Sequence, residues 1–313
     1  MWVLLRQDPA GFPLKTMTNA FKTIALMGNF DDARIRETIC SIAGKIAGQQ
    51  IAVRVSDRWD TAELPGSVVK TAASEVTQSA DLIIAVGGDG SMLFAARAAA
   101  TAGIPVLGIN RGRLGFLADV SPSDHLEALD AILGGEYECE ERMLLKSEIV
   151  AKDGQRECGI ALNDVVVKRQ YTGRMLEFQT HVDGRYVNTH GGDGFIVATP
   201  TGSTAYALSC GGPIVTPGLD AVVLAPICPH TLSDRPIVIP AASTTEVSVH
   251  EHQNDVAEVS CDGEVAGQLA PGEKLRISVA RARVELIHPR GYDYYEILRN
   301  KLHWGRGNRK TTL

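Results

Sequence analysis

Apolar and polar positions follow two different patterns along the chain, and the first fills residues 17–140. Four short apolar runs there have the length and composition of strands: residues 23–28, 51–56, 82–88 and 104–110. Between them, residues 31–48 and 91–103 show helical spacing, and the second of these stretches ends at Gly103. Strands that alternate with helices indicate a parallel sheet with helices on its faces. We therefore predict a Rossmann-like α/β domain over this part of the chain.

The second pattern begins after residue 140, where segments with β-branched residues alternate with period two between turn residues. It predicts an all-β, sandwich-like domain over residues 141–287. Helical spacing returns at residues 292–304, so we expect residues 288–313 to rejoin the first domain. No low-complexity linker separates the two domains, which predicts an active site in the inter-domain cleft.

Composition and charge narrow the class of protein. A hydrophobic share of 44% with 22% charged residues is ordinary for a folded chain, and a net charge of -6 argues against a nucleic-acid partner. No run of ~18 apolar residues predicts a membrane span. The six cysteines have neither zinc-ligand nor disulfide-framework spacing, which predicts reduced thiols and a cytoplasmic protein. Residues 1–16 are interpreted as a leader or a mis-assigned start, because Met17 precedes the first predicted strand.

A glycine-rich turn joins the third predicted strand to the helix after it. Gly87, Gly88 and Gly90 let the backbone turn sharply and approach a ligand, and a helix N-terminus offers N–H groups to a phosphate. The turn is neither a Walker loop nor a dinucleotide fingerprint, because it lacks Gly-Lys-Ser/Thr and the G-x-G-x-x-G spacing.

Asp89 in this turn is the most informative residue, because a carboxylate repels phosphate. It suits a group that accepts a proton from an attacking hydroxyl or holds a metal that bridges phosphates. An aspartate that caps the amides of its own helix is the equally common alternative.

Two further segments have side chains that suit a nucleotide. Residues 199–206 gather hydroxyl side chains around one glycine, which suits ribose or phosphate, with Tyr206 placed to flank an adenine; a Ser/Thr-rich turn is the alternative. Asn163, Asp164 and Asp193 could bind a ribose diol, since a carboxylate accepts from both hydroxyls, or could simply shape turns.

Together these segments resemble the NAD kinase family over residues 22–304. The resemblance rests on segments that occur in family order: GGDGSM, INRGRLGFL, LNDVVV, GDGFIVATPTGSTAYALSCGGPIV and PHTLSDRP. TPTGSTAY beside GGDG is the specific signal, since GGDG alone also resembles lipid kinases and phosphofructokinases. The resemblance implies transfer of a phosphoryl group from ATP to the 2′-hydroxyl of the adenosine ribose of NAD, which gives NADP.

The resemblance also assigns roles to residues. Asp89 would be the proton acceptor, and the three glycines of its turn would approach the donor phosphates. Asn163 and Asp164 would hold the adenosine ribose, Asp193 would lie near the nicotinamide end, and Arg174 would reach a second nucleotide. The nucleotide pocket would be lined by Thr204, Ala205, Tyr206, Ala207, Leu208 and Ser209. Members are homodimers or homotetramers with sites completed across subunits, and they use a divalent cation, Mg²⁺, delivered with ATP.

The chain departs from the family pattern at three positions. Asp164 stands where Glu is commoner, and Glu264 takes the place of a frequent Gln. Gly191 replaces an Arg found two residues before the site aspartate, so a neighbour such as His190 would have to compensate. Arg113, with Arg111, follows the fourth predicted strand and is a further candidate for the ATP phosphates, although solvated loop arginines are more common.

Two rival functions remain from the sequence. One is a lipid or sugar-phosphate kinase of the same superfamily, and the other is a non-catalytic NAD(P)-binding regulator. The histidines do not cluster as ligands, and no all-protein metal cage is predicted.

Overall fold

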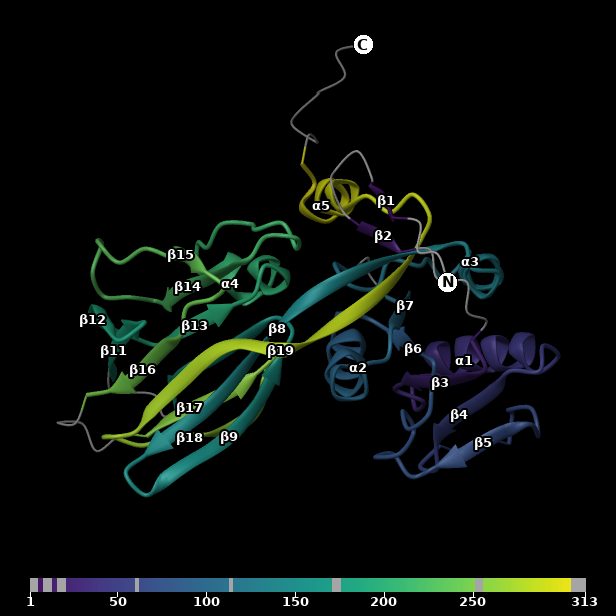
Figure 1. Cartoon of the computed structure of the whole chain (residues 1–313), viewed down its shortest axis with the longest axis horizontal. Coiled ribbons are helices and arrows are strands. Elements are labelled where there is room, and N and C mark those ends of the chain that lie inside the picture. The colour runs from purple at the N-terminus through teal and green to yellow at the C-terminus, as the bar shows by residue number, and fades with distance from the viewer. Residues whose placement is uncertain are drawn as a thin grey trace, which may run out of the picture. The chain divides into compact units, whose positions relative to one another are not determined.

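A computed structural model describes residues 5–7, 13–15, 21–59, 62–112, 115–170, 176–250 and 256–304. The chain forms two compact units (Figure 1). Unit 1 comprises Met1–Glu141 with Val284–Leu313, and unit 2 comprises Arg142–Arg283. No helix in the described ranges is long and apolar enough to cross a membrane.

Unit 1 is built on a parallel sheet with strand order β5-β4-β3-β6-β7. Its strands are β3 (Thr23–Gly28), β4 (Ala52–Ser56), β5 (Val68–Thr71), β6 (Leu82–Gly87) and β7 (Val106–Asn110). The four predicted strands are confirmed by β3, β4, β6 and β7, and β5 was missed. Because β4 and β5 extend the sheet on one side of β3 and β6 and β7 on the other, the strand order reverses between β3 and β6.

Three helices lie on the two faces of this sheet, and a fourth follows it. They are α1 (Ala33–Ile46), α2 (Asp89–Ala102), α3 (His125–Leu133) and α5 (Tyr294–Leu302). Buried residues of α1 and α3 share one core cluster with Leu107 and Ile109, whereas Gly108 between those two faces Met92 of α2. Hence α1 and α3 cover one face of the sheet and α2 covers the other. The predicted helices are confirmed, and α3 was missed.

Two long strands cross the boundary between the units: β8 (Tyr137–Ala151) and β19 (Lys274–Pro289). In unit 1, β19 pairs in parallel with β7 through Leu286 and Ile287. In unit 2, its first half pairs antiparallel with β16. A separate two-stranded antiparallel ribbon is formed by β1 (Leu5–Gln7) and β2 (Pro13–Lys15).

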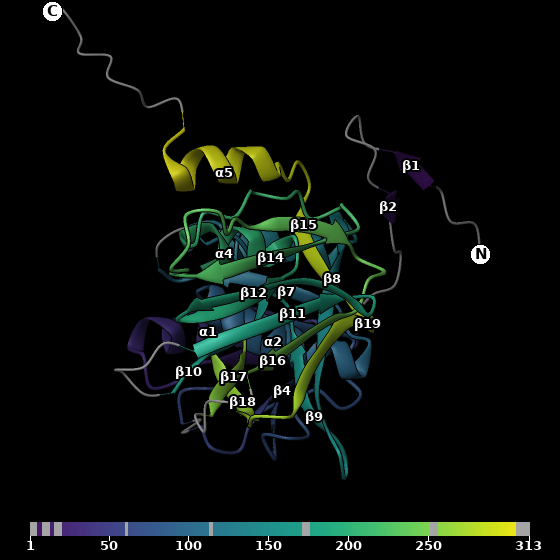
Figure 2. The same ribbon diagram turned by 90° about the vertical axis from the view of Figure 1, so that its left-hand side faces the viewer.

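Unit 2 consists of two antiparallel sheets. The first has the order β15-β14-β13-β10-β17-β18, and the second joins β12, β11, β16 and β19, with β8 paired to β19 and β9 (Figure 2). The strands are β9 (Gly154–Ala161), β10 (Asp164–Arg169), β11 (Leu176–Val182), β12 (Arg185–Gly192), β13 (Gly194–Ala198), β14 (Ala221–Ile227), β15 (Ile237–Pro240), β16 (Thr245–Val249), β17 (Ala257–Cys261) and β18 (Glu264–Leu269).

The core of unit 2 lies between these sheets. Alternate residues of strands from both sheets, such as Val165, Val197, Phe178 and Val247, form one buried apolar cluster. This alternation is what period-two sequence produces when one face of each sheet is buried, and the predicted sandwich is confirmed. The outer face of the six-stranded sheet carries a smaller cluster, which is joined by Ala207 of the short helix α4 (Tyr206–Ser209).

Candidate active site

The turn between β6 and α2 requires glycine at its first position. Gly87 has a φ of 151°, and a Cβ there would lie 2.1 Å from Oγ of Ser91. Gly88 is the N-cap of α2, and no side chain caps the first amides of that helix. A helix N-terminus with open amides binds anions through its N–H groups and its positive dipole end. The turn therefore has the open helix N-terminus that the predicted phosphate site would need.

The carboxylate of Asp89 is held by the backbone of a second loop. The N–H of Phe116 donates to its Oδ2 and the N–H of Leu117 to its Oδ1, both at 3.0 Å. The loop packs so closely that a Cβ on Gly115 would lie 2.1 Å from Oδ1. Asp89 thus caps residues 115–117, whereas the sequence offered the amides of its own helix as the alternative. Since each carboxylate oxygen has two lone pairs, both can still accept a further proton donor.

Of the two arginines proposed to reach phosphate, the structure describes one. The Arg111 backbone N–H donates to the Gly87 carbonyl at 2.9 Å, so the loop after β7 lies against the glycine turn. Its guanidinium donates to the Arg34 carbonyl at 3.1 Å and pairs with Glu37 at 3.4 Å. The side chain of Arg111 is thus directed to α1 and not to the turn. Arg113 lies outside the described residues, as does Arg174.

A buried histidine anchors the other end of the loop that holds Asp89. His288 of β19 is 2% exposed, with Nδ1 at 2.8 Å from Asp119 and Nε2 at 3.4 Å from Glu140. The ring of Tyr292 stacks on it at 3.8 Å. Burial lowers the pKa of His288, but the two carboxylates more than offset this and raise it to about 9. A charged imidazolium therefore fixes Asp119, two residues after Leu117, and sequence reasoning missed it.

In unit 2, one aspartate organises the start of β10. The carboxylate of Asp262, which follows β17, accepts from the backbone N–H groups of Leu162, Asn163 and Asp164 at 2.9, 2.7 and 3.2 Å. The predicted Asn163–Asp164 pair is thereby held in a fixed backbone conformation. Asp262 was not predicted from the sequence, whereas Glu264 of the same segment was a candidate and is exposed at the start of β18.

Asp164 is a buried carboxyl with an unusual pKa. It is 5% exposed, and burial together with the nearby Asp262 carboxylate raises its pKa to about 7. Its neighbour Val166 points to the outer face of the six-stranded sheet, and since side chains alternate along a strand, Asp164 points to that face too. Buried acids with displaced pKa values are typical of functional sites.

The hydroxyl groups of the loop after β13 form hydrogen bonds within the protein itself. Those of Thr199, Ser203 and Thr204 donate to backbone carbonyls of Leu162, Pro200 and Thr201, and the Thr201 hydroxyl accepts from the fully buried Arg142. The protons of these hydroxyls are thus used within the loop, as the Ser/Thr-rich turn alternative expects, and contact of their remaining lone pairs with a ligand stays a prediction.

Gly202 in this loop lets two backbones meet, because a Cβ there would lie 2.0 Å from the Asn163 carbonyl oxygen. The loop consequently joins the start of β10 to α4, whose Ala207 is buried on the outer face of the sheet. Tyr206 remains 43% exposed. Burial raises its pKa, and Cys210, Cys228, Asp193 and Asp164 add to the shift. Residues 204–209, Asp164 and Asp193 thus share one region of unit 2.

Asp193 lies between β12 and β13 and has a basic partner that was not predicted from the sequence. Arg169 pairs with its carboxylate at 3.0 Å. His190, expected to compensate for the absent arginine at Gly191, is instead 1% exposed between the rings of Phe178 and Phe195, at 5.6 and 5.2 Å. That expectation is wrong, and Arg169 supplies the positive charge beside Asp193.

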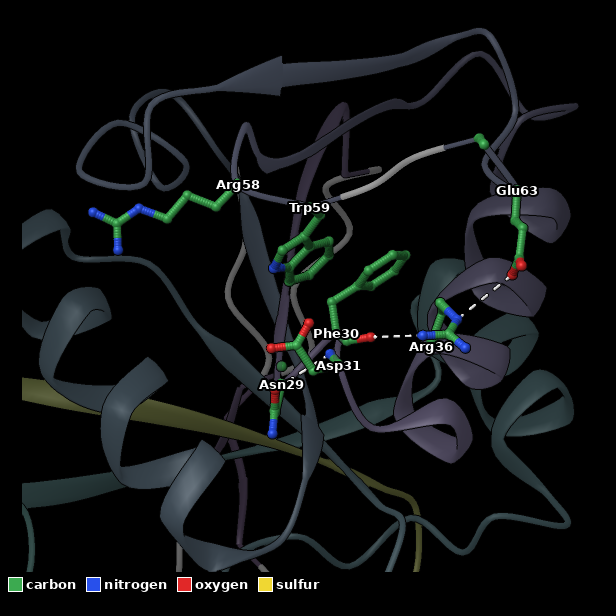
Figure 3. A pocket seen from close by; sticks show the side chains of 9 residues that line it. Asn29, Phe30, Asp31, Arg36, Arg58, Trp59 and Glu63 are labelled. Carbon is green, nitrogen blue, oxygen red and sulfur yellow. Dashed lines mark hydrogen bonds and ion pairs between the residues drawn. The ribbon is translucent and has the colours of Figure 1, made fainter.

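A cavity of about 530 Å³ opens in unit 1 near the ends of β3 and β4 (Figure 3). The rings of Phe30 and Trp59 stack there at 4.6 Å and 8°. The Arg36 guanidinium donates to the Phe30 carbonyl at 3.3 Å and pairs with Glu63 at 3.7 Å. The cavity is lined by Gly28, Asn29, Phe30, Asp31, Arg36, Arg58, Trp59, Ala62 and Glu63. No sequence signal predicted it, because its lining comes from three separate segments.

The fold and the glycine turn are typical of a nucleotide-phosphate-binding protein, and comparison with known proteins shows the family. Residues 41–137 match the model of the ATP-NAD kinase N-terminal domain, and residues 162–289 match that of the ATP-NAD kinase C-terminal domain. An NAD kinase of Nitrosococcus oceani is 45% identical over 93% of this chain and 99% of its own, and one of Chromohalobacter salexigens is 44% identical over 91% and 97%. The chain belongs to the NAD kinase family.

Two solved structures share the fold. A yeast NADH kinase complexed with NADH has a TM-score of 0.85 at 22% identity and covers 95% of this chain and 92% of its own. An NAD kinase from Archaeoglobus fulgidus in complex with ATP has a TM-score of 0.69 at 25% identity, with 90% and 98% coverage. Both contain the α/β sheet and the antiparallel β unit described above.

Proposed function

We propose that this protein is an NAD kinase that transfers the terminal phosphoryl group of ATP to the 2′-hydroxyl of the adenosine ribose of NAD, which gives NADP and ADP. Family membership at 41–45% identity with bacterial NAD kinases supports the reaction. The observation that carries the mechanism is the Asp89 carboxylate, fixed at the N-terminus of α2 inside a glycine turn.

In the proposed reaction, the open amides at Gly88 and Gly90 and the dipole of α2 hold the donor phosphates. The 2′-oxygen attacks the terminal phosphorus as its proton passes to Asp89, and the bond from that phosphorus to the bridging oxygen of ADP breaks. General-base assistance of this kind contributes about 10²–10⁴-fold in rate. Positioning and charge stabilisation supply most of the remainder in phosphoryl transfer.

The acceptor, NAD, is assigned to unit 2. Asn163 and Asp164 bind the adenosine ribose, Asp193 lies toward the nicotinamide end, and residues 204–209 line the pocket; Arg174, Gly191 and Glu264 remain further candidates. The fixed backbone at the start of β10, the raised pKa of Asp164 and the ion pair of Asp193 with Arg169 support a built polar site on this unit.

A divalent cation enters with ATP. Within the described ranges, no three His, Cys, Asp or Glu side chains gather to hold a metal, so the phosphates would be its main ligands. Asp89 is the one carboxylate of the glycine turn and is the residue that would contact the cation. The cation would neutralise the charge of the phosphates. We further propose a homodimer or homotetramer in the cytoplasm.

One assay tests the proposed reaction. NADP formation from ATP, Mg²⁺ and NAD is followed with an NADP-specific dehydrogenase, and parallel reactions offer a diacylglycerol or fructose 6-phosphate as the acceptor. We expect turnover with NAD alone. Binding of NAD without turnover would indicate a non-catalytic regulator, and phosphorylation of the lipid or the sugar would refute the proposal.

A further inference from the structure

The connection between β9 and β10 carries Asn163 and leads directly into Asp164, and it depends on hydrogen bonds from other segments of unit 2. Here the chain passes from the sheet that contains β9 to the six-stranded sheet that contains β10. Leu162 and Asn163 lie between the two strands and outside their ladders. Because unpaired backbone groups are costly when they are buried, such a connection needs partners from elsewhere.

Asp262 bonds every N–H group of this connection. Its carboxylate accepts from Leu162, Asn163 and Asp164 at 2.9, 2.7 and 3.2 Å, and its own N–H donates to the Asp164 carbonyl at 2.9 Å. All three partners of the carboxylate are donors, which is the bonding pattern of an ionised carboxylate. Asp262 has a φ of 50° and is followed by Gly263, so it occupies an Asp-Gly turn between β17 and β18.

Thr199 bonds the carbonyl side of the same connection. Its hydroxyl donates to the Leu162 carbonyl, and its N–H donates to the Asn163 carbonyl at 2.9 Å. Thr199 is fully buried and directly follows β13. Each backbone N–H and C=O group of residues 162–164 is therefore bonded to Asp262 or to Thr199. A backbone that is bonded at every polar group is restrained to one conformation, which fixes where its side chains begin.

Asp262 also acts on Asp164 through its charge. Asp164 is buried, and burial together with the Asp262 carboxylate raises its pKa to about 7. Tyr206 and Cys210 interact with Asp164 as well, but burial raises the pKa of both, so they are neutral at pH 7. Ionised Asp164 can accept from both hydroxyls of a ribose, whereas the protonated acid has to donate one of its bonds.

We propose that Asp262 is the positioning residue of the acceptor site: through the backbone of residues 162–164 it directs Asn163 and Asp164 at the adenosine ribose of NAD. The proposal rests on the proposed kinase function and deepens it, because it assigns the geometry of the acceptor site to a residue that acts through others. Functional side chains work only when supporting residues hold them within about 0.5 Å of the productive position. In addition, the negative charge of Asp262 makes the affinity for NAD depend on pH near neutrality.

Asp262→Asn tests the proposal by calorimetric titration with NAD. The single side-chain oxygen of asparagine cannot accept from all three N–H groups in the native arrangement, and its NH₂ group faces at least one of these donors. A charge-assisted hydrogen bond is worth about 10- to 100-fold in an equilibrium constant, so the Kd for NAD should rise by that factor. We expect kcat at saturating NAD to stay within about threefold of wild type, because Asp89 belongs to unit 1.

Asp183→Asn is the matched control, because Asp183 occupies the same kind of turn. It has a φ of 51°, is followed by Gly184 and joins β11 to β12, and its N–H and its carboxylate both bond to the backbone of Thr244 at 2.9 Å. The substitution removes the same charge from the same backbone conformation, away from the connection between β9 and β10. The Kd for NAD should stay within about twofold of wild type.

The pH dependence of the titration separates positioning with a charge from a simple loss of stability. In wild type, the Kd for NAD should fall as pH rises through about 7, because ionised Asp164 accepts from both ribose hydroxyls. In Asp262→Asn the neighbouring charge is lost, so the midpoint should move to lower pH. In Asp183→Asn the midpoint should stay where it is in wild type. A purely structural loss would weaken binding and leave the midpoint unchanged.

Two variants on the carbonyl side keep the proposal testable if Asp262→Asn folds poorly. Thr199→Val removes the hydroxyl that bonds the Leu162 carbonyl but retains the backbone N–H, and it should raise the Kd for NAD about tenfold. Thr199→Ser keeps a hydroxyl and should hold the Kd within about threefold of wild type.

Two results would overturn the proposal. One is a Kd for NAD within about twofold of wild type in both Asp262→Asn and Thr199→Val, and the other is a midpoint in Asp262→Asn equal to that of wild type. If wild type itself binds no NAD, the proposed kinase function fails. If wild type and all variants bind NAD equally, only the role of Asp262 fails.

Discussion

Replacing Asp89 by Asn removes the proposed proton acceptor and also disturbs the loop that holds it. In the native structure each carboxylate oxygen accepts one backbone N–H, from Phe116 and from Leu117. A side-chain amide has one oxygen, so the variant must direct its NH₂ group at one of these two donors. Losing one charge-assisted hydrogen bond costs about 1.5–3 kcal/mol. For a unit of this size, that corresponds to a fall in Tm of roughly 3–10 °C.

The effect on turnover should be larger than this structural effect. Loss of general-base assistance predicts a fall in kcat of about 10²–10⁴-fold. At an assay temperature well below the Tm of the variant nearly all molecules remain folded, so destabilisation alone cannot produce that fall. We therefore expect the KM for NAD to stay within a few-fold, because NAD is assigned to unit 2, while kcat collapses.

Asp81→Asn is the matched control for this experiment. Asp81 precedes β6, at the end of the strand opposite to Asp89, and its Oδ2 accepts the N–H groups of both Lys22 and Thr23 at 2.9 Å. Asparagine can keep both bonds through its single oxygen, so only the charge is lost and kcat should equal that of wild type. A kcat within twofold of wild type in Asp89→Asn, or an equal loss in both variants, would refute Asp89 as the proton acceptor.

Three further substitutions test other parts of the structure. The pKa of Asp164, about 7, lies above its ordinary value of 3.8, so the free energy of unfolding, and with it the Tm, falls as pH rises from about 4 to 7. Asp164→Asn should remove this pH dependence of the Tm but weaken NAD binding. The pKa of His288, about 9, lies above its ordinary value of 6.5, so the stability that its charge contributes is complete below pH 6.5 and is lost as pH rises through 9. His288→Gln should abolish this pH dependence and lower the free energy of unfolding, measured with urea, by about 3–5 kcal/mol. Gly202→Ala, whose Cβ would clash with Asn163, should lower the free energy of unfolding by about 1–3 kcal/mol and raise the KM for NAD. An unchanged KM would show that the close approach of these two backbone segments does not shape the acceptor site.

Most of the fold follows from local sequence pattern, and the two elements that were missed show where such patterns fail. β5 has four residues at the edge of the sheet, two of them exposed, so it forms no continuous apolar run. α3 has nine residues and buries only Leu129 and Ile132 deeply, which is too short a stretch for helical periodicity to distinguish it from a turn. Both elements are stabilised by neighbours that are distant in sequence.

The candidate site could be predicted only where its residues are contiguous in the sequence. The glycine turn was found because strand, glycines and helix are contiguous, and Asp89 was found because a carboxylate is unexpected there. Its hydrogen-bond donors lie 27 and 28 residues further on, and Asp262 lies about 100 residues from the amides that it holds. For residues 199–204 the hydroxyls of Thr199, Ser203 and Thr204 donate to backbone carbonyls, which composition alone could not show.

The position of Asp89 depends on a chain of contacts that ends far from it in sequence. Residues 115–117 fix its carboxylate, the backbone of Val120 bonds to that of Gly108 and Asn110 in β7, and Asp119 between them is paired with His288. A catalytic group acts efficiently only when its supporting residues prevent other orientations. If Asp89 is the proton acceptor, loss of the His288 charge should therefore lower kcat more than it raises either KM, because the substrates still bind while the carboxylate loses its fixed orientation. An equal change in kcat and in both KM values would instead mean that the histidine only stabilises unit 1.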